Sequence, residues 1–127
     1  MVLDRVMAVV LGAGSVMFGI GPVIAPRWFA RQVGIPVESD PRLQVMVRSV
    51  GVRDAVIGTG LARAAARGGG YRGWLVARLL SDWGDAAAIG LAVRSGSRDP
   101  RFLMLGAIAV AAGVFGDLVY WLGSRRG

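Results

Sequence analysis

The sequence predicts an all-α integral membrane protein, an antiparallel bundle of four transmembrane helices that forms one domain over residues 1–127. Three observations support this class. Hydrophobic residues make up 54% of the chain and charged residues only 18%. The apolar residues gather in four runs, each close to the roughly 20 residues that cross a bilayer. A soluble domain of this size would need polar residues over its outside, which these runs do not provide.

The first apolar run covers residues 6–25, and at about 1.5 Å per residue it matches a hydrocarbon core of about 30 Å. It is longer than the roughly 7 to 15 apolar residues of a cleaved signal peptide, so we expect it to stay in the mature protein. Ala8, Gly12, Ser15 and Gly19 recur at spacings of three and four. This spacing predicts a stripe of small residues that faces the bundle.

The connection after the first run combines prolines with cations and aromatic rings. Arg27, Trp28, Phe29 and Arg31 lie within it, and four prolines bracket it. Such a mixture is typical of a short helix that lies on the membrane surface.

Three further spans are predicted, and glycine or proline separates them. We expect these helices over residues 42–62, 74–93 and 102–122. Three glycines at 68–70 break the chain between the first two, and Asp99-Pro100 marks the turn before the last. Four spans place both termini on the same side of the membrane.

The arginines say little about which side of the membrane the termini occupy. Six arginines near the ends of the spans lie on the terminal side, and six lie on the opposite side. The turn around the three glycines carries Arg63, Arg67 and Arg72 and no acidic residue. Short cationic loops stay in the cytoplasm, so this turn favours cytoplasmic termini.

Composition excludes several kinds of chemistry. The chain has no Cys and no His, which rules out disulfides, thiolate or imidazole metal sites and Cys or His nucleophiles. We therefore expect neither a metal nor a cofactor. The net charge of +7 comes with arginine as the only basic residue type. Most arginines lie at helix ends, which predicts contact with membrane lipid phosphates and no binding of nucleic acid.

Seven charged residues fall inside the predicted spans. A charge at the centre of a span costs about 2.5 to 3.5 kcal/mol on insertion, so such residues persist when they pair, face a wet cavity or have a function. Arg48 lies near the end of its predicted helix, where its long side chain reaches the lipid headgroups. The seven are Arg48, Arg53, Asp54, Arg78, Asp82, Asp85 and Asp117.

The third span places three of these charges on one face. Arg78, Asp82 and Asp85 stand at i, i+4 and i+7, so Arg78 reaches Asp82 directly. Asp85 lies one turn further along and needs a partner from another helix. Arg53 of the second span lies at a similar depth, so we expect Arg53, its neighbour Asp54 and Asp85 to lie in one connected polar network.

Asp54 shares its helix face with Gly51 and Gly58, whose missing side chains let a neighbouring helix or a ligand approach. The fourth span contributes Asp117 on a stripe with Tyr120 and two glycines. The second, third and fourth spans are therefore expected to converge on one polar interior. Trp83 lies mid-span away from the acidic face and is expected to meet lipid or to pack on a neighbouring helix.

Two short motifs resemble those of known families. Asp82-Trp83-Gly84-Asp85 is similar to the two-Asp opening of CDP-alcohol phosphotransferases, but the rest of that motif is absent, so no magnesium site is predicted. The run Gly51-Val52-Arg53-Asp54-x-x-x-Gly58, in a four-span chain of this length, resembles small bacterial membrane families akin to the DoxX-like proteins. This resemblance implies the bundle and the bacterial inner (cytoplasmic) membrane, and it implies little about activity.

The leading functional hypothesis is an intramembrane enzyme that acts on a lipophilic small molecule. The spans carry more central carboxylates than central arginines, so one carboxylic acid can be protonated beside an ionised one, as acid-base catalysis requires. Isomerisation, cyclisation or epoxide opening fits such a site, by chemical analogy with limonene-type epoxide hydrolases of another fold. The expected roles are Asp54 and Asp85 as the acid-base pair, Asp82 with Arg78 as the orienting pair, Arg53 as charge stabiliser, Tyr120 as a donor and Asp117 as a further member.

Two other hypotheses remain open. Carboxylates at mid-depth with compensating arginines also form proton relays, which suits a proton-coupled transporter or channel subunit. That function requires a homo-oligomer, with the small-residue stripe of the first span as its interface. Alternatively, the charges only hold the helices of a structural membrane subunit in register.

Overall fold

The computed structural model describes residues 2–126, which form five α-helices and no β-strand. The all-α class is therefore confirmed. Each predicted span lies largely within one of the four long helices. The largest difference in bounds is at the end of the second span, which was predicted to end at residue 62 and whose helix ends at Arg67. The helices are α1 (Leu3–Ile24), α2 (Pro26–Gln32), α3 (Pro41–Arg67), α4 (Tyr71–Arg94) and α5 (Pro100–Ser124).

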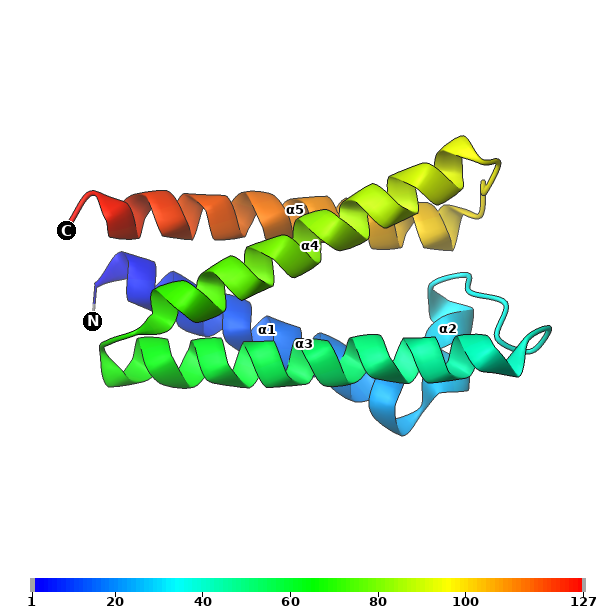
Figure 1. The fold of residues 1–127 in the computed structure, drawn as a ribbon, viewed down its shortest axis with the longest axis horizontal. Helices are drawn as coiled ribbons and strands as arrows, with labels where there is room; N and C mark the ends of the chain where they lie inside the picture. Colours follow the sequence, from blue (N-terminus) through cyan, green and yellow to red (C-terminus); the bar gives the residue numbers. More distant parts are fainter. Residues whose placement is uncertain (1, 127) are drawn as a thin grey trace.

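The four long helices alternate in direction, and both ends of the described chain lie at the same end of the bundle (Figure 1). Helices α1 and α3 lie side by side, while α4 starts beside the end of α3 and crosses to α5. The α1–α3 pair and the α4–α5 pair are therefore close at the terminal end and diverge towards the other end. The short α2 lies at that other end, which confirms a helix in the first connection.

Local sequence signals set the helix boundaries. Asp40 caps α3 and Asp99 caps α5 by accepting a hydrogen bond from the backbone amide two residues later, and each is followed by a proline in the first turn. Gly68 caps the end of α3, and its φ of 89° lies in the left-handed region that glycine adopts without strain. Its amide donates to the carbonyl of Ala65. This cap allows the sharp turn into α4.

Small residues bring α1 and α3 into backbone contact. Gly12 faces Gly58, and Gly19 faces Gly51, so that a Cβ added at Gly12 would lie 2.6 Å from the Gly58 carbonyl oxygen. All four stripe residues of α1 are buried. The prediction that the stripe faces the bundle is confirmed. Because the stripe packs against α3 of the same chain, it is not free to form the interface of an assembly, and that expectation was wrong.

Adding one methyl group at this contact is expected to destabilise the fold. Gly12→Ala forces α1 away from α3, and overpacking of this kind costs about 1 to 3 kcal/mol. The matched control is Gly14→Ala on the same helix, where an added Cβ meets nothing within 4 Å and the better helix propensity of alanine stabilises slightly. Melting temperatures of the two purified variants in detergent check the prediction. Equal melting temperatures would show that the close contact is absent.

The terminal end of the bundle is held by a buried carboxylate. The Tyr71 hydroxyl donates to Asp4 Oδ2 at 2.6 Å, and Arg126 donates to Asp4 Oδ1 at 3.1 Å. These two donors satisfy both oxygens of the buried Asp4 carboxylate. Arg72 adds a bond to the Gly123 carbonyl. The first turns of α1 and α4 are thereby tied to the end of α5.

Two apolar clusters flank the middle of the bundle. The larger one, near the termini, includes Leu61, Leu75 and Val119, all fully buried. The smaller one, at the opposite end, joins Ala30 and Val37 to α3. The polar residues described below lie between these two clusters.

Two of the described helices, α1 and α5, are long and apolar enough to cross a membrane. Helices α3 and α4 are long enough, but each carries charged residues in its middle, which lowers its hydropathy. Composition alone therefore points to two membrane helices, and the four-span arrangement stays a prediction.

Candidate functional site

A cavity of about 720 Å³ lies between the four long helices. This volume is within the usual range of about 300 to 1,000 Å³ for small-molecule sites. Its lining is mostly apolar and includes four phenylalanines, Phe18, Phe29, Phe102 and Phe115. The polar lining residues form a single cluster: Ser15, Asp54, Arg78, Asp82 and Asp85.

Arg78 and Asp82 form the most buried ion pair of this cluster. They are 4% and 3% exposed, and they lie one turn apart on α4. Arg78 Nε donates to Asp82 Oδ2 at 2.9 Å, and Nη2 donates to the other carboxylate oxygen. The predicted contact between these residues is confirmed. This bidentate geometry fixes the guanidinium plane and aims its remaining nitrogen at the other helices.

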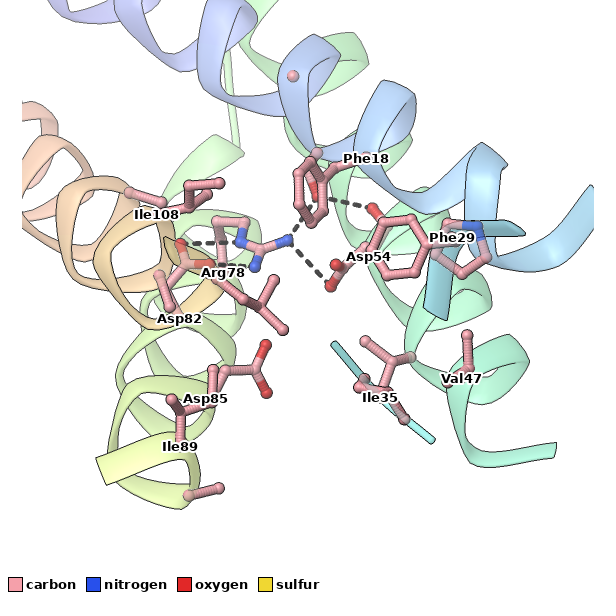
Figure 2. Close-up of a pocket in the computed structure, with 18 of the residues that line it drawn as sticks. Phe18, Phe29, Ile35, Val47, Asp54, Arg78, Asp82, Asp85, Ile89 and Ile108 are labelled. Atoms are coloured by element: carbon pink, nitrogen blue, oxygen red, sulfur yellow. Dashed lines mark hydrogen bonds and ion pairs between the residues drawn. The ribbon is translucent and has the colours of Figure 1, made fainter. Parts of the chain in front are cut away.

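The remaining nitrogen of Arg78 joins α4 to α1 and α3 (Figure 2). Its Nη1 donates to Ser15 Oγ on α1 and to Asp54 Oδ1 on α3, the latter at 3.2 Å. The Ser15 hydroxyl in turn donates to the Asp54 backbone carbonyl at 2.7 Å. Sequence reasoning treated Ser15 only as a small residue and missed this role. The signal was available, because Ser15 is the one hydroxyl within an otherwise apolar stripe.

Arg53 connects the two acids predicted to act together. Its Nε and Nη2 donate to Asp54 Oδ1 at 3.1 and 2.9 Å. Its Nη1 and Nη2 donate to the two oxygens of Asp85 at 3.0 and 2.6 Å. The expectations that Asp85 takes its partner from another helix and that all five charged residues form one network are confirmed.

The fourth span does not contribute to this network, which corrects a prediction. Asp117 is exposed and accepts a hydrogen bond from Trp83 Nε1 at 3.2 Å. Tyr120 is 46% exposed. Neither residue lines the cavity, because α5 turns Gly113, Gly116 and Val119 towards the bundle instead. The third helix of the cluster is α1, through Ser15.

The position of Trp83 explains the rotation of α5. An added Cβ at Gly113 would lie 2.7 Å from the Trp83 ring, so the indole packs directly on the α5 backbone. Of the two positions expected for Trp83, facing lipid or packing on a neighbouring helix, the packing on a neighbouring helix is confirmed. The small residues Ala109, Gly113 and Gly116 form a spacing of four and three in the sequence, which was the signal for the inward face of α5.

The cluster contains one more carboxylate than guanidinium groups. Three aspartates face two arginines, so the sum of the charges is −1 when all five groups are ionised. Asp54 is 6% exposed, and its Oδ1 accepts from three arginine nitrogens. Within residues 2–126 no donor contacts its Oδ2. This carboxylate points from α3 into the space between the helices (Figure 2).

Across residues 2–126, no group of three or more His, Cys, Asp or Glu side chains is placed to hold a metal ion. No protein-family model matches the chain, and comparisons with curated proteins and with solved structures found no significant match. The resemblance of the 51–58 motif to the DoxX-like proteins stays a prediction.

Proposed function

We propose that all four long helices span a membrane, which by the resemblance stated above is the bacterial cytoplasmic membrane. The direction of the side chains supports this arrangement. Every exposed residue of α4 between residues 73 and 93 is apolar or glycine, while Arg78 and Asp82 are buried. In α3, the exposed residues between 50 and 62 are three valines and Thr59. Paired, inward charges with an apolar outside are what a bilayer requires of a polar helix.

Cysteine labelling provides a test of the four-span arrangement. The chain has no Cys, so single variants Val2→Cys and Ser124→Cys each carry one reactive thiol. Four spans place both thiols on the same side, and a membrane-impermeant maleimide added to right-side-out vesicles should label both or neither. Labelling of only one thiol would remove a span and contradict the proposal.

We infer that the protein is an acid-base enzyme for a lipophilic small molecule. The single observation that carries this function is the free Asp54 Oδ2 in an apolar cavity of about 720 Å³. A proton on this oxygen balances the cluster, with two positive and two negative charges left. The proton can then pass to an alkene carbon, an epoxide oxygen or a carbonyl oxygen of a bound substrate.

The other members of the cluster have supporting roles in this proposal. After the proton leaves, Asp54 is ionised beside a substrate that has gained positive charge, and the network is already oriented to stabilise that pair. Asp85, which is partly exposed in the same cavity, accepts a proton from a neighbouring substrate atom. Arg53 holds both acids in place, and the Arg78–Asp82 pair orients Asp54. Such a reaction is an isomerisation, a cyclisation or an epoxide opening, and it needs no cofactor.

The first test of this function is to identify what the cavity holds in the cell. The protein is purified in detergent, extracted with organic solvent and analysed by mass spectrometry for hydrophobic metabolites. A matched preparation of Ala112→Trp, which places an indole among the lining residues, serves as the control. We expect a metabolite that is enriched with the wild type and depleted in the variant. Identical extracts from two folded proteins would count against the cavity as a binding site.

A further inference from the structure

We propose that the cavity recognises lipophilic monocations, with a protonated amine bound at Asp54 Oδ2 and the apolar body among the phenylalanines. This inference rests on the proposed function in that the same cavity holds the substrate. It concerns the ionised form of Asp54, which is the form that remains after the proposed proton transfer, and it adds the charge and the hydrogen-bonding character of the group that this form selects.

The charge of the network favours a cation. Three carboxylates and two guanidinium groups leave one negative charge in a mostly apolar cavity. Uncompensated charge in such surroundings is costly, so a ligand with one positive charge removes the cost on binding. A ligand with a negative charge increases it.

The hydrogen-bonding groups give the same preference. Every guanidinium nitrogen of Arg53 and Arg78 already donates to a residue of the cluster. Among residues 2–126, the one side-chain nitrogen or oxygen of the cluster that makes no hydrogen bond is an acceptor, Asp54 Oδ2, on a side chain that is more than nine-tenths buried. An ammonium N–H satisfies this acceptor with a charge-assisted hydrogen bond, whereas a carboxylate ligand has no donor to offer.

Aromatic rings in the lining add a third, independent preference. Phe18 and Phe29 pack edge to face with ring centroids 5.5 Å apart, and both line the same cavity as Asp54. Figure 2 shows these two rings and the Asp54 carboxylate among the residues that line the cavity. The faces of aromatic rings attract cations, and the attraction grows in surroundings that exclude water. The same features stabilise the positive charge that develops in the proposed reaction, so an alkylammonium ion resembles that state.

Three amphiphiles of equal chain length provide the test: dodecylamine, 1-dodecanol and dodecanoate. Binding to the wild-type protein is measured at pH 7 in a non-ionic detergent by the rise in melting temperature with ligand concentration. We expect dodecylammonium to bind about 10- to 100-fold more tightly than dodecanoate, as one charge-assisted hydrogen bond provides. Dodecanol should fall between them.

Two variants separate the cavity from simple partitioning into the micelle. Asp54→Asn should lose the preference for the amine, because the amide removes the charge and the free acceptor. Asp117→Asn should keep the preference, since Asp117 lies outside the cavity. If Asp54→Asn fails to fold, the order of the three binding affinities for the wild-type protein tests the monocation preference by itself.

The outcomes distinguish this inference from the proposed function. Tightest binding of dodecanoate, or equal binding of all three, overturns the monocation preference and leaves the cavity as a lipophilic site. A preference for the amine that persists in Asp54→Asn overturns the assignment to Asp54. Failure of all three to bind contradicts both the inference and the proposed function.

Discussion

Arg78→Gln is expected to cost about 3 to 5 kcal/mol of stability, the usual effect of removing one partner from a buried ion pair. Arg78 is 4% exposed and donates to Asp82, Asp54 and Ser15. Without it, the charges of the cluster sum to −2, and Asp82 loses both hydrogen bonds from its partner. Because these contacts join three helices, their loss should weaken the packing of α4 against α1 and α3. The melting temperature in detergent measures the effect.

The matched control for this variant is Arg94→Gln on the same helix. Arg94 is exposed at the end of α4, and surface substitutions usually change stability by less than about 0.5 kcal/mol. An Arg78→Gln protein that melts within a degree of the Arg94→Gln protein would mean that the buried network does not hold the bundle together.

Asp54→Asn is expected to keep the fold and to lower turnover by about 10²- to 10⁴-fold. The substrate for this assay is the metabolite that co-purifies with the wild-type protein. The geometry makes this substitution unusually selective. The amide oxygen can take the position of Oδ1, where three arginine nitrogens donate, and the amide nitrogen then replaces the free Oδ2. The amide is neutral, as the protonated acid of the proposal is, so two positive and two negative charges remain in the cluster. The acid is therefore removed without leaving an unpaired arginine.

Stability and turnover must be measured on the same preparations, with Asp117→Asn as the control. That residue accepts one hydrogen bond from Trp83 at the surface of α5, and an amide keeps the acceptor. We expect wild-type turnover and stability for this control. If Asp54→Asn instead unfolds while its turnover per folded molecule stays at the wild-type level, the cluster is a structural ion network and the catalytic proposal fails.

The pairings within the cluster were largely predictable from spacing. A separation of four residues brings Arg78 and Asp82 together on any α-helix, and the cost of an unpaired charge in an apolar bundle required a partner for Asp85. The similar depth of Arg53 was sufficient to identify that partner. These predictions succeed because they depend on helix geometry and on charge pairing, both of which are local or strongly constrained.

The errors on α5 have a different cause. Asp117 and Tyr120 were placed inside because polar residues on an apolar helix usually face the interior. The sequence of α5 is apolar on nearly all sides, so its hydropathy did not identify the face that meets α4, and the spacing of its small residues was not used to place that face. The tight approach of Trp83 to Gly113 fixes that face, and it turns Asp117 outwards.

The sequence by itself determined the five-helix content, the close-packing stripe of α1 and the set of charges that must pair, because these follow from helix periodicity, residue size and the cost of isolated charge. Only the tertiary structure decided which helices enclose the cavity, that Ser15 completes the network and that Asp54 keeps one free oxygen. These features depend on how each helix is rotated about its axis. When the side facing lipid and the side facing a neighbour are both apolar, only the fit of side chains across the interface fixes that rotation.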